Sequence, residues 1–217
     1  MLEERTGIMC FGDSNTWGYV PKVIGDTSVA KRYDEDTRWT GILSKLLGQD
    51  FVVYEQGMSG RTTIYDVPGE AYRIGAPQLL PCLYTCAPLS LVVLMLGTND
   101  LVLTANPPCE GKLAEGVLAM GRSIQQFEKC GKNGIPPQIL LVSPALVNTK
   151  VETLLAANRL SRLFAQEYKQ ATEQLGCGFL DAAQYTRPSE VDGVHLEPES
   201  HRALAHAIAK KVLEMLK

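Results

Sequence analysis

The sequence predicts an α/β protein, a three-layer α/β/α sandwich built on a doubly wound, five-stranded parallel sheet. Five short apolar runs rich in Val, Ile, Leu and Phe are spread along the chain, and such runs suit strands that are covered on both faces. Segments with helical spacing of apolar residues fill most of the intervals. Alternation of strands and helices favours a parallel sheet with helices on both sides.

The expected elements follow in chain order. The apolar runs are Gly7–Phe11, Phe51–Glu55, Leu89–Leu96, Gln138–Val142 and Gly178–Leu180. The helical patterns are Trp39–Leu47, Leu113–Cys130, Val151–Leu175 and Pro198–Leu216. Glycine follows each of the first three patterns, as helix C-termini often require. The last pattern has glutamates near its start and lysines near its end, the signs that the helix dipole favours.

Composition indicates one domain over residues 1–217. The chain shows no repeat, low-complexity tract or linker, and its 45% hydrophobic content supplies a sizeable core. With 21% charged residues and a net charge of -3, nothing points to nucleic acid or an anionic membrane as partner. The longest apolar run, Leu89–Leu96, is too short to cross a bilayer, so we expect no membrane insertion.

The N-terminus and the cysteines point to a cytoplasmic protein. Met1–Arg5 opens with acids rather than a basic region, so we expect no signal peptide. The six cysteines form no CxxC pair, and no nearby histidine completes a zinc set with Cys82 and Cys86. We therefore expect reduced, mostly buried thiols and no bound metal.

Four polar segments should meet at one edge of the sheet. Ligands bind beyond the carboxyl ends of parallel strands. Ser14 follows the first apolar run, Gly57 the second and Asn99 the third, and a late loop carries Asp192 and His195. Each residue alone has an ordinary explanation: a turn glycine, a loop asparagine, an aspartate that caps a turn and a surface histidine. Their convergence indicates a nucleophilic hydrolase, because a serine hydroxyl needs an adjacent base.

The same residues resemble the four blocks of the SGNH, or GDSL-type, hydrolase family, which has a flavodoxin-like fold. The blocks appear in order as Gly12-Asp13-Ser14-Asn15, Gly57, Gly97-Thr98-Asn99-Asp100 and Asp192-Gly193-Val194-His195. The flanking residues are similar to the arylesterase and acyltransferase branch, in Ser14-Asn15-Thr16-Trp17-Gly18, Arg38-Trp39, Gly60-Arg61-Thr62-Thr63 and Met95–Asp100.

The resemblance implies a serine esterase that forms an acyl-enzyme on Ser14 and passes the acyl group to water or to an alcohol. His195 would be the general base and Asp192 would orient it. The oxyanion would be held by the backbone N–H groups of Ser14 and Gly57 and by the side-chain amide of Asn99. The implied substrates are short-chain aryl or alkyl esters. No cofactor is expected, and self-association into a homo-oligomer is implied as well.

Residues beside the blocks receive smaller roles. Asn15 stands where many members carry Leu, and we expect it to alter the edge of the pocket without affecting the mechanism. Trp17 is predicted to line the substrate pocket, with a core position as the alternative. Asp13 and Asp100 are expected to shape their loops through backbone hydrogen bonds.

Three further features are left outside catalysis. Arg61 receives no catalytic role, although it could contact substrate or a neighbouring subunit. His201 and His206 lie in the last helical pattern and are expected to be solvated. The long loop from Tyr19 to Arg38 is either functional or a solvated excursion.

Two kinds of alternative function remain open at this point. On the same three catalytic residues, the chain could be a carbohydrate acetylesterase, a lysophospholipase or a thioesterase. It could also be a non-catalytic, flavodoxin-like binding module that uses its first loop for an anion.

Overall fold

Five parallel strands form the centre of the computed structural model, which describes residues 5–217. The strands are β1 (Thr6–Gly12), β2 (Phe51–Gly57), β3 (Leu91–Met95), β4 (Gln138–Ser143) and β5 (Gly178–Asp181). They lie in the order β2-β1-β3-β4-β5, so the chain leaves β1 first toward one edge and then toward the other. The predicted doubly wound parallel sheet is confirmed. The signal-peptide prediction falls largely on Met1–Glu4, which lie outside the described residues.

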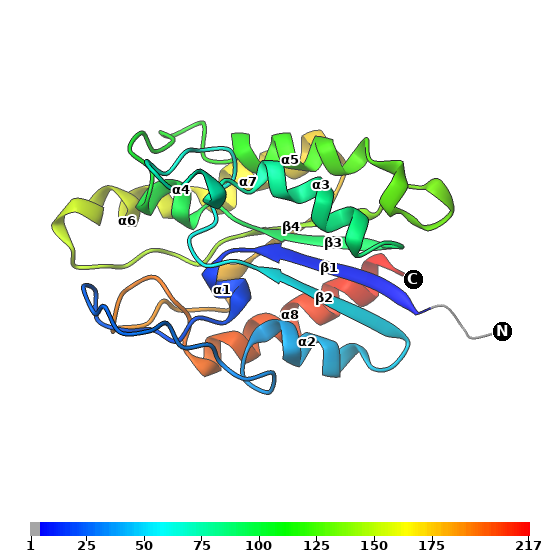
Figure 1. Ribbon diagram of the computed structural model, residues 1–217, viewed down its shortest axis with the longest axis horizontal. Helices are drawn as coiled ribbons and strands as arrows, with labels where there is room; N and C mark the ends of the chain where they lie inside the picture. Colours follow the sequence, from blue (N-terminus) through cyan, green and yellow to red (C-terminus); the bar gives the residue numbers. More distant parts are fainter. Residues whose placement is uncertain (1–4) are drawn as a thin grey trace.

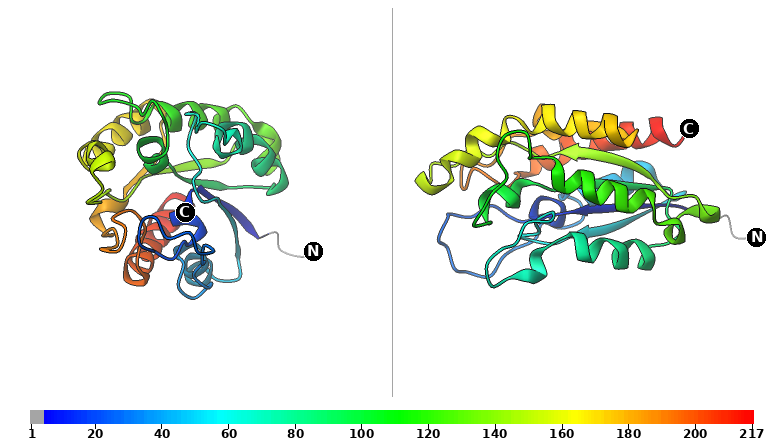
Figure 2. Two further views of the ribbon diagram at one scale, coloured as in Figure 1. Left: turned by 60° about the vertical axis from the view of Figure 1, so that its left-hand side comes forward. Right: turned by 90° about the horizontal axis from the view of Figure 1, so that it is seen from above.

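Helices cover both faces of this sheet. One face carries α2 (Trp39–Leu47) and α8 (Pro198–Met215), and the other carries α3 (Ala76–Thr85), α5 (Glu115–Gln125) and α7 (Phe164–Leu175) (Figures 1 and 2). The core divides accordingly into two clusters, because alternate residues of each strand point to opposite faces. In β1, for example, Ile8 and Cys10 pack on the α2 side, whereas Met9 and Phe11 pack on the α3 side.

Short helices gather at the carboxyl edge of the sheet. They are α1 (Ser14–Trp17), α4 (Thr98–Val102) and α6 (Leu155–Ser161), and they lie with the long loops at the left end of the molecule in Figure 1. The C-terminal residue lies at the opposite end. Among the described residues, no helix is both long and apolar enough to cross a membrane.

Besides the short α1 and α4, which were not predicted, the helices differ from the predicted ones in three places. Helix α3 was not predicted, because Pro77 and Pro81 resemble turn signals; Pro77 occupies the first turn, where its missing N–H is tolerated. The pattern Leu113–Cys130 yields the shorter α5, followed by a 3-10 turn at Glu128–Cys130. The pattern Val151–Leu175 is divided into a 3-10 turn (Glu152–Leu154), α6 and α7. Apolar periodicity carries through such breaks and does not reveal them.

One buried hydrogen bond fixes the loop after β3. The Tyr168 hydroxyl of α7 donates to the Leu96 carbonyl at 2.6 Å, and both side chains are fully buried. The next residue, Gly97, has φ of +128°, and a Cβ there would collide with the Tyr168 hydroxyl. Tyr168 therefore sets the path by which β3 delivers α4 to the carboxyl edge.

Replacing Tyr168 with Phe should lower the free energy of unfolding by about 1–3 kcal/mol, because the buried Leu96 carbonyl loses its donor. Denaturant unfolding measures the loss. The exposed Tyr84→Phe variant is the control and should change stability by less than about 0.5 kcal/mol. Equal stability of the two variants would show that the Tyr168 bond has no net value.

Candidate active site

The nucleophile candidate begins a short helix at the end of β1. The Asp13 carboxylate accepts a hydrogen bond from the Asn15 backbone N–H at 2.9 Å and caps α1. Ser14 is the first residue of α1, so its own N–H has no acceptor within the helix. The sharp change from strand to helix leaves both the hydroxyl and the N–H of Ser14 at the carboxyl edge.

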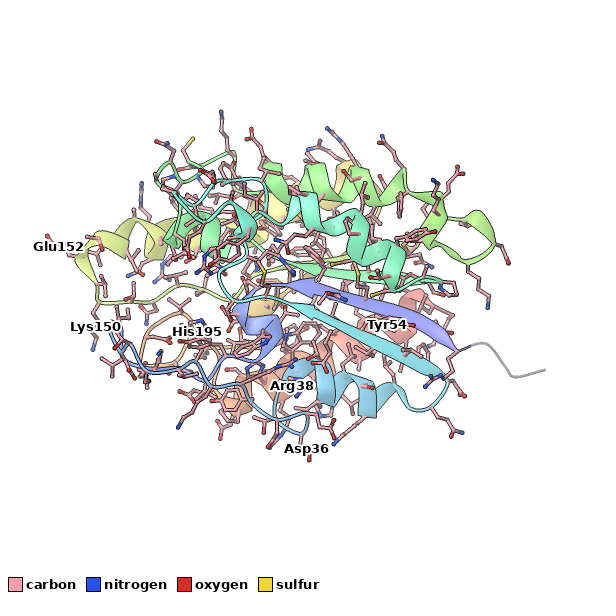
Figure 3. All side chains as sticks on the ribbon, in the orientation of Figure 1. Asp36, Arg38, Tyr54, Lys150, Glu152 and His195 are labelled. Atoms are coloured by element: carbon pink, nitrogen blue, oxygen red, sulfur yellow. The ribbon has the colours of Figure 1, made fainter. Side chains whose placement is uncertain are left out.

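The structure brings Ser14, His195 and Asp192 together. His195 Nε2 lies 3.0 Å from Ser14 Oγ, and His195 Nδ1 lies 2.8 Å from Asp192 Oδ2. Asp192 Oδ1 also accepts the backbone N–H groups of Val194 and His195, at 2.9 Å each. All of these distances are those of well-formed hydrogen bonds. Figure 3 shows His195 at the end of the molecule where the strands terminate.

The surroundings keep Asp192 ionised. Burial by itself raises the pKa of this carboxyl. The hydrogen bonds and charge of His195 and the hydrogen bond from the Val194 N–H lower the pKa by more, so the net pKa lies below its ordinary value. An ionised Asp192 accepts from Nδ1–H, which leaves the lone pair of Nε2 facing Ser14. The arrangement can therefore accept a proton from the serine hydroxyl.

A cavity of about 480 Å³ opens beside Ser14. Its floor includes Ser14, Asn99 and His195. Its walls are largely apolar and come from three segments, with Val23 and Ile24 from the Tyr19–Arg38 loop, Val102 and Leu103 at α4, and Leu154 before α6. The long loop after Ser14 thus contributes one wall of the cavity.

The structure places Gly57 outside this cavity and Gly60 in its lining. Gly57 packs against α1, where a Cβ would collide with the backbone of Thr16 and Trp17. Gly60 has φ of +76°, and its N–H has no acceptor within residues 5–217. Gly60 rather than Gly57 therefore lines the cavity, whereas Gly57 was expected to place an N–H there. The Ser-Gly pair within Gly57–Thr63 was the available signal, since a tight turn needs a residue with positive φ.

The carbonyl of the same peptide unit is fixed by an arginine. Arg73 Nη1 donates to the Ser59 carbonyl at 2.9 Å, and the Glu70 carboxylate accepts from Arg73 Nε and Nη2 at 2.8 and 3.0 Å. A trans peptide points its C=O and N–H in opposite directions. Holding the Ser59 carbonyl therefore also holds the direction of the Gly60 N–H.

Asn99 is buried and held at the cavity. Its Nδ2 donates to the Arg61 carbonyl at 3.0 Å, which leaves the second amide hydrogen for the cavity. The neighbouring Asp100 accepts from both the backbone N–H and the hydroxyl of Thr63, at 2.8 and 2.7 Å. These bonds join the turn that contains Gly60 to α4.

Two aromatic residues take unexpected positions. Trp17, predicted to line the pocket, is not among the residues that line the cavity; its ring lies under Arg32, whose guanidinium is 5.5 Å from the ring centroid. Tyr19 lines the cavity instead and stacks on His195, with ring centroids 4.3 Å apart and planes inclined by 22°. The sequence prediction missed Tyr19, which had no motif of its own.

Arg61 is an internal residue. Its guanidinium donates to the carbonyls of Gly12 and Gln56 and lies 4.0 Å from the centroid of Phe11. It is only 4% exposed, so the suggested contact with substrate or with another subunit is wrong. Burial lowers the pKa of Arg61 to about 10.

The solvated position predicted for His201 is wrong, whereas His206 is exposed as expected. His201 is fully buried against α2, and its Nδ1 accepts the Trp39 N–H at 3.3 Å. Burial lowers the pKa of His201 to about 4, so the ring is neutral. Its burial follows from the packing of α8 on α2, which a pattern within one helix does not specify.

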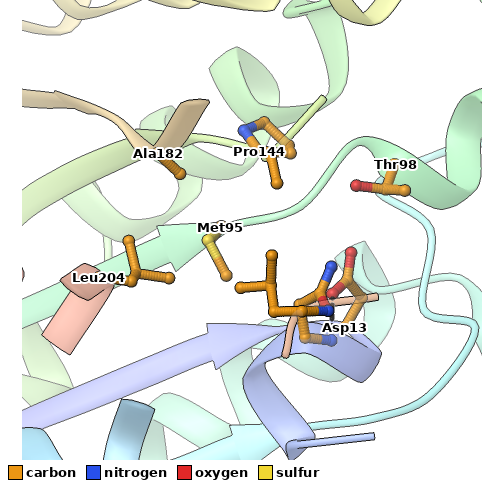
Figure 4. A pocket seen from close by; sticks show the side chains of 9 residues that line it. Asp13, Met95, Thr98, Pro144, Ala182 and Leu204 are labelled. Carbon is orange, nitrogen blue, oxygen red and sulfur yellow. Dashed lines mark hydrogen bonds between the residues drawn. The ribbon is translucent and has the colours of Figure 1, made fainter. Parts of the chain in front are cut away.

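Two buried carboxylates lie close to the site. Burial raises the pKa of Asp13 to about 6, against the opposing hydrogen bond from Asn15, and burial raises that of Asp100 to about 7. Figure 4 shows Asp13 beside a small, mainly apolar space below the edge of the sheet. Residues that line the space include Met95, Pro144, Ala182 and Leu204. The low polarity of this region is the physical cause of the raised pKa of Asp13.

Among residues 5–217, no three His, Cys, Asp or Glu side chains form a group that could hold a metal ion. The six cysteines are all free thiols.

Comparison with known proteins identifies the family. The model of the GDSL-like lipase/acylhydrolase family matches residues 10–203, and the chain belongs to this family. The protein is a serine hydrolase that acts on ester bonds. The alternative of a non-catalytic binding module is therefore wrong. No curated protein sequence matches the chain.

Solved structures agree with this assignment. The inhibitor-bound aryl esterase of M. smegmatis is 33% identical and has a TM-score of 0.87, with 96% of this chain and 99% of that chain covered. Est24, a carbohydrate acetylesterase from Sinorhizobium meliloti, is 32% identical with a TM-score of 0.84, over 97% of this chain and 100% of that chain.

Asp13 should make stability depend on pH. Its pKa is 3.8 in an unfolded chain and about 6 in the folded protein. Between these values the folded state holds a proton that the unfolded state has lost, so the free energy of unfolding falls as pH rises through this window. The size of the effect is about 3 kcal/mol. Asp13→Asn keeps an oxygen acceptor for the Asn15 N–H and should abolish this part of the slope.

Urea unfolding at several pH values from about 4 to 7 checks this prediction, with the exposed Asp66→Asn variant as control. The Asp13→Asn variant should gain stability over wild type as pH rises, and Asp66→Asn should follow the wild type. Identical slopes for wild type and Asp13→Asn would contradict it.

Proposed function

We propose that Ser14 is the nucleophile, His195 the general base and Asp192 the residue that orients the imidazole. The observation that carries this proposal is the continuous set of contacts from Ser14 Oγ to His195 and on to Asp192, at 3.0 and 2.8 Å, at the edge of a cavity. A serine hydroxyl becomes an effective nucleophile when an adjacent base can take its proton.

The acylation step starts when an ester binds with its carbonyl carbon next to Ser14 Oγ. The oxygen attacks that carbon while its proton passes to His195 Nε2, and Asp192 stabilises the imidazolium. Tyr19, stacked on His195, adds an aromatic face against the same ring. As the tetrahedral intermediate collapses, the bond to the alcohol oxygen breaks, and Nε2 returns the proton to that oxygen.

The negative oxygen of the intermediate would be held by three donors. They are the backbone N–H of Ser14, the backbone N–H of Gly60 and Nδ2 of Asn99. Their support is the lining of the cavity and the lack of a protein acceptor for the Gly60 N–H within the described residues. Donors fixed in place before reaction stabilise the transition state without reorganising, and one such donor is typically worth about 3–4 kcal/mol.

Deacylation repeats the chemistry with another acceptor. A water molecule, or an alcohol in acyl transfer, attacks the acyl carbon while His195 takes its proton. The acyl–Ser14 bond then breaks, and the serine oxygen regains its proton. These steps use side chains and backbone groups of this chain and require no cofactor.

The substrate we propose is a short-chain acyl ester of an aryl or alkyl alcohol. Apolar walls from Val23, Ile24, Val102, Leu103 and Leu154 suit an uncharged, partly apolar ester. The similarity to an aryl esterase supports the same class. Hydrolysis and transfer share the acyl-enzyme, and the balance between them depends on which acceptor reaches it.

A carbohydrate acetylesterase activity is the second candidate. The cavity is also lined by four residues with polar groups, which are Lys22, Asp26, Ser59 and Arg73. These groups could form hydrogen bonds with the hydroxyl groups of a sugar. The similarity to Est24 supports this candidate. Lysophospholipase and thioesterase activities have no comparable feature in their favour.

We further propose that residues 1–217 act as one hydrolase domain, since the family model spans 10–203. A cytoplasmic location stays a prediction from the sequence, and assembly into a homo-oligomer stays an implication of the family resemblance.

Replacing Ser14 with Ala should lower the hydrolysis of an aryl acetate by at least about a thousandfold, because the acyl-enzyme is not formed. Initial rates measure this, with the exposed Ser44→Ala variant on α2 as control. Wild-type rates from Ser14→Ala would overturn the assignment. The same assay with acetylated sugars, acyl thioesters and lysolipids ranks the substrate classes, and the highest kcat/KM should belong to the short aryl or alkyl esters.

A further inference from the structure

The loop that carries the proposed base is internally well ordered. Residues 186–196, here called the His195 loop, contain hydrogen bonds from Ser189 N to the His195 carbonyl at 2.7 Å and from Gly193 N to the Ser189 carbonyl at 2.8 Å. Asp192 adds its two bonds to the backbone at Val194 and His195. The loop is also joined to the segment after β4, because the Asn148 N–H donates to the Gly193 carbonyl at 2.7 Å. The position of His195 relative to Ser14 depends in addition on what holds the loop to α1.

Three hydrogen bonds within the described residues join the His195 loop to α1. One is the Ser14–His195 contact itself, and the other two are made by the side chain of Asn15. Asn15 Oδ1 accepts the Leu196 N–H at 3.1 Å, and Asn15 Nδ2 donates to the Val194 carbonyl at 3.3 Å. The amide thus pairs with the backbone on both sides of His195, much as a neighbouring strand would.

These two hydrogen bonds matter energetically because Asn15 is buried. Its side chain is only 4% exposed, and it borders the small apolar space that Met95 and Leu204 also line. Buried backbone groups that lose a partner are costly because water cannot replace it. The Asn15 amide is also directly adjacent in sequence to the nucleophile, while its two partners are directly adjacent to the base. The link is therefore as short as the chain permits.

We propose that Asn15 is a positioning residue, which holds the His195 loop against α1 and so fixes the distance between His195 Nε2 and Ser14 Oγ. This inference rests on the proposed roles of Ser14 and His195. It reverses the expectation that Asn15 affects only the edge of the pocket, since Asn15 is not among the residues that line the cavity.

The chemistry of the amide explains why this residue is Asn. Leu has the same number of side-chain heavy atoms and the same branch point, but it offers neither acceptor nor donor. In family members with Leu at this position, the two backbone groups need other partners. In this chain Asn15 supplies both, so its loss should be felt in catalysis and not only in stability.

The test compares Asn15→Leu and Asn15→Asp with wild type. Asn15→Leu removes both bonds and keeps the number of side-chain heavy atoms, whereas Asn15→Asp keeps an acceptor for the Leu196 N–H and loses the donor to Val194. The control is Gln125→Leu, at a position outside the cavity. It removes a hydrogen bond of the same kind, which the side-chain amide of Gln125 donates from Nε2 to the Leu175 carbonyl at 2.6 Å. Urea unfolding gives the folded fraction of each protein.

On folded protein, Asn15→Leu should lower kcat for an aryl acetate by about 10–100-fold, because a misplacement near 1 Å can cost about 100-fold. KM should change little, since substrate contacts the cavity and not Asn15. The rate of phosphonate labelling at Ser14 should fall in parallel with kcat, and the low-field proton signal of the His195–Asp192 bond should shift or broaden. Asn15→Asp should recover part of kcat, and Gln125→Leu should retain all of it.

Two results would overturn the proposal. If Asn15→Leu is folded and keeps the wild-type kcat, labelling rate and His195 signal, Asn15 is not a positioning residue. If Asn15→Leu only lowers stability, to the same extent as Gln125→Leu and with unchanged kcat, its role is purely structural. Ser14→Ala, assayed alongside, separates these from failure of the proposed function, because an active Ser14→Ala would remove the roles on which the inference rests.

Discussion

The contact between the Ser14 hydroxyl and the His195 imidazole joins residues that are 181 positions apart in the chain. Neither residue belongs to a long helix or a strand, so the sheet has to hold their loops in place. Strand β1 ends at Gly12, two residues before Ser14, and α8 starts two residues after Leu196. Packing of α8 on α2 buries His201, which anchors the start of α8 below the site. The arrangement of the sheet and these two helices thus determines whether the proposed base, His195, can reach Ser14.

Polar groups inside the protein support the same edge in a second way. Arg61 binds the carbonyl groups at the ends of β1 and β2, Asp100 binds Thr63, and Asp13 binds the N–H of Asn15. Each group satisfies backbone or side-chain partners that water does not reach, as buried polar atoms require. These residues hold the loops, while Ser14, Gly60, Asn99 and His195 remain directed at the cavity. The division separates residues that line the cavity from residues that keep them in position.

The sequence predicted the sheet and most of its longer helices, because apolar runs and helical periodicity indicate directly which residues are buried. It also predicted Ser14, Asn99, Asp192 and His195 at one edge of the sheet, and the structure brings all four to one cavity. Ser14 and Asn99 follow apolar runs whose ends could be predicted, whereas Asp192 and His195 were placed by their loop motif. The sequence did not reveal α3, whose prolines resemble a turn, and the prediction chose Gly57 at a place where the structure has Gly60 lining the cavity. That choice depends on the path of a turn after β2, which the apolar pattern does not specify. Tyr19 and Asn15 act through contacts with a loop near the other end of the chain, and only the folded chain reveals them.

A crystal structure of the protein after reaction with an organophosphonate would test the central claim most directly. The account predicts one phosphorus atom bonded to Ser14 Oγ, with its oxygen within hydrogen-bond distance of Ser14 N, Gly60 N and Asn99 Nδ2, and with His195 Nε2 beside the serine oxygen. A phosphorus atom on another residue, or an oxygen held by Gly57 with Gly60 turned away, would contradict it.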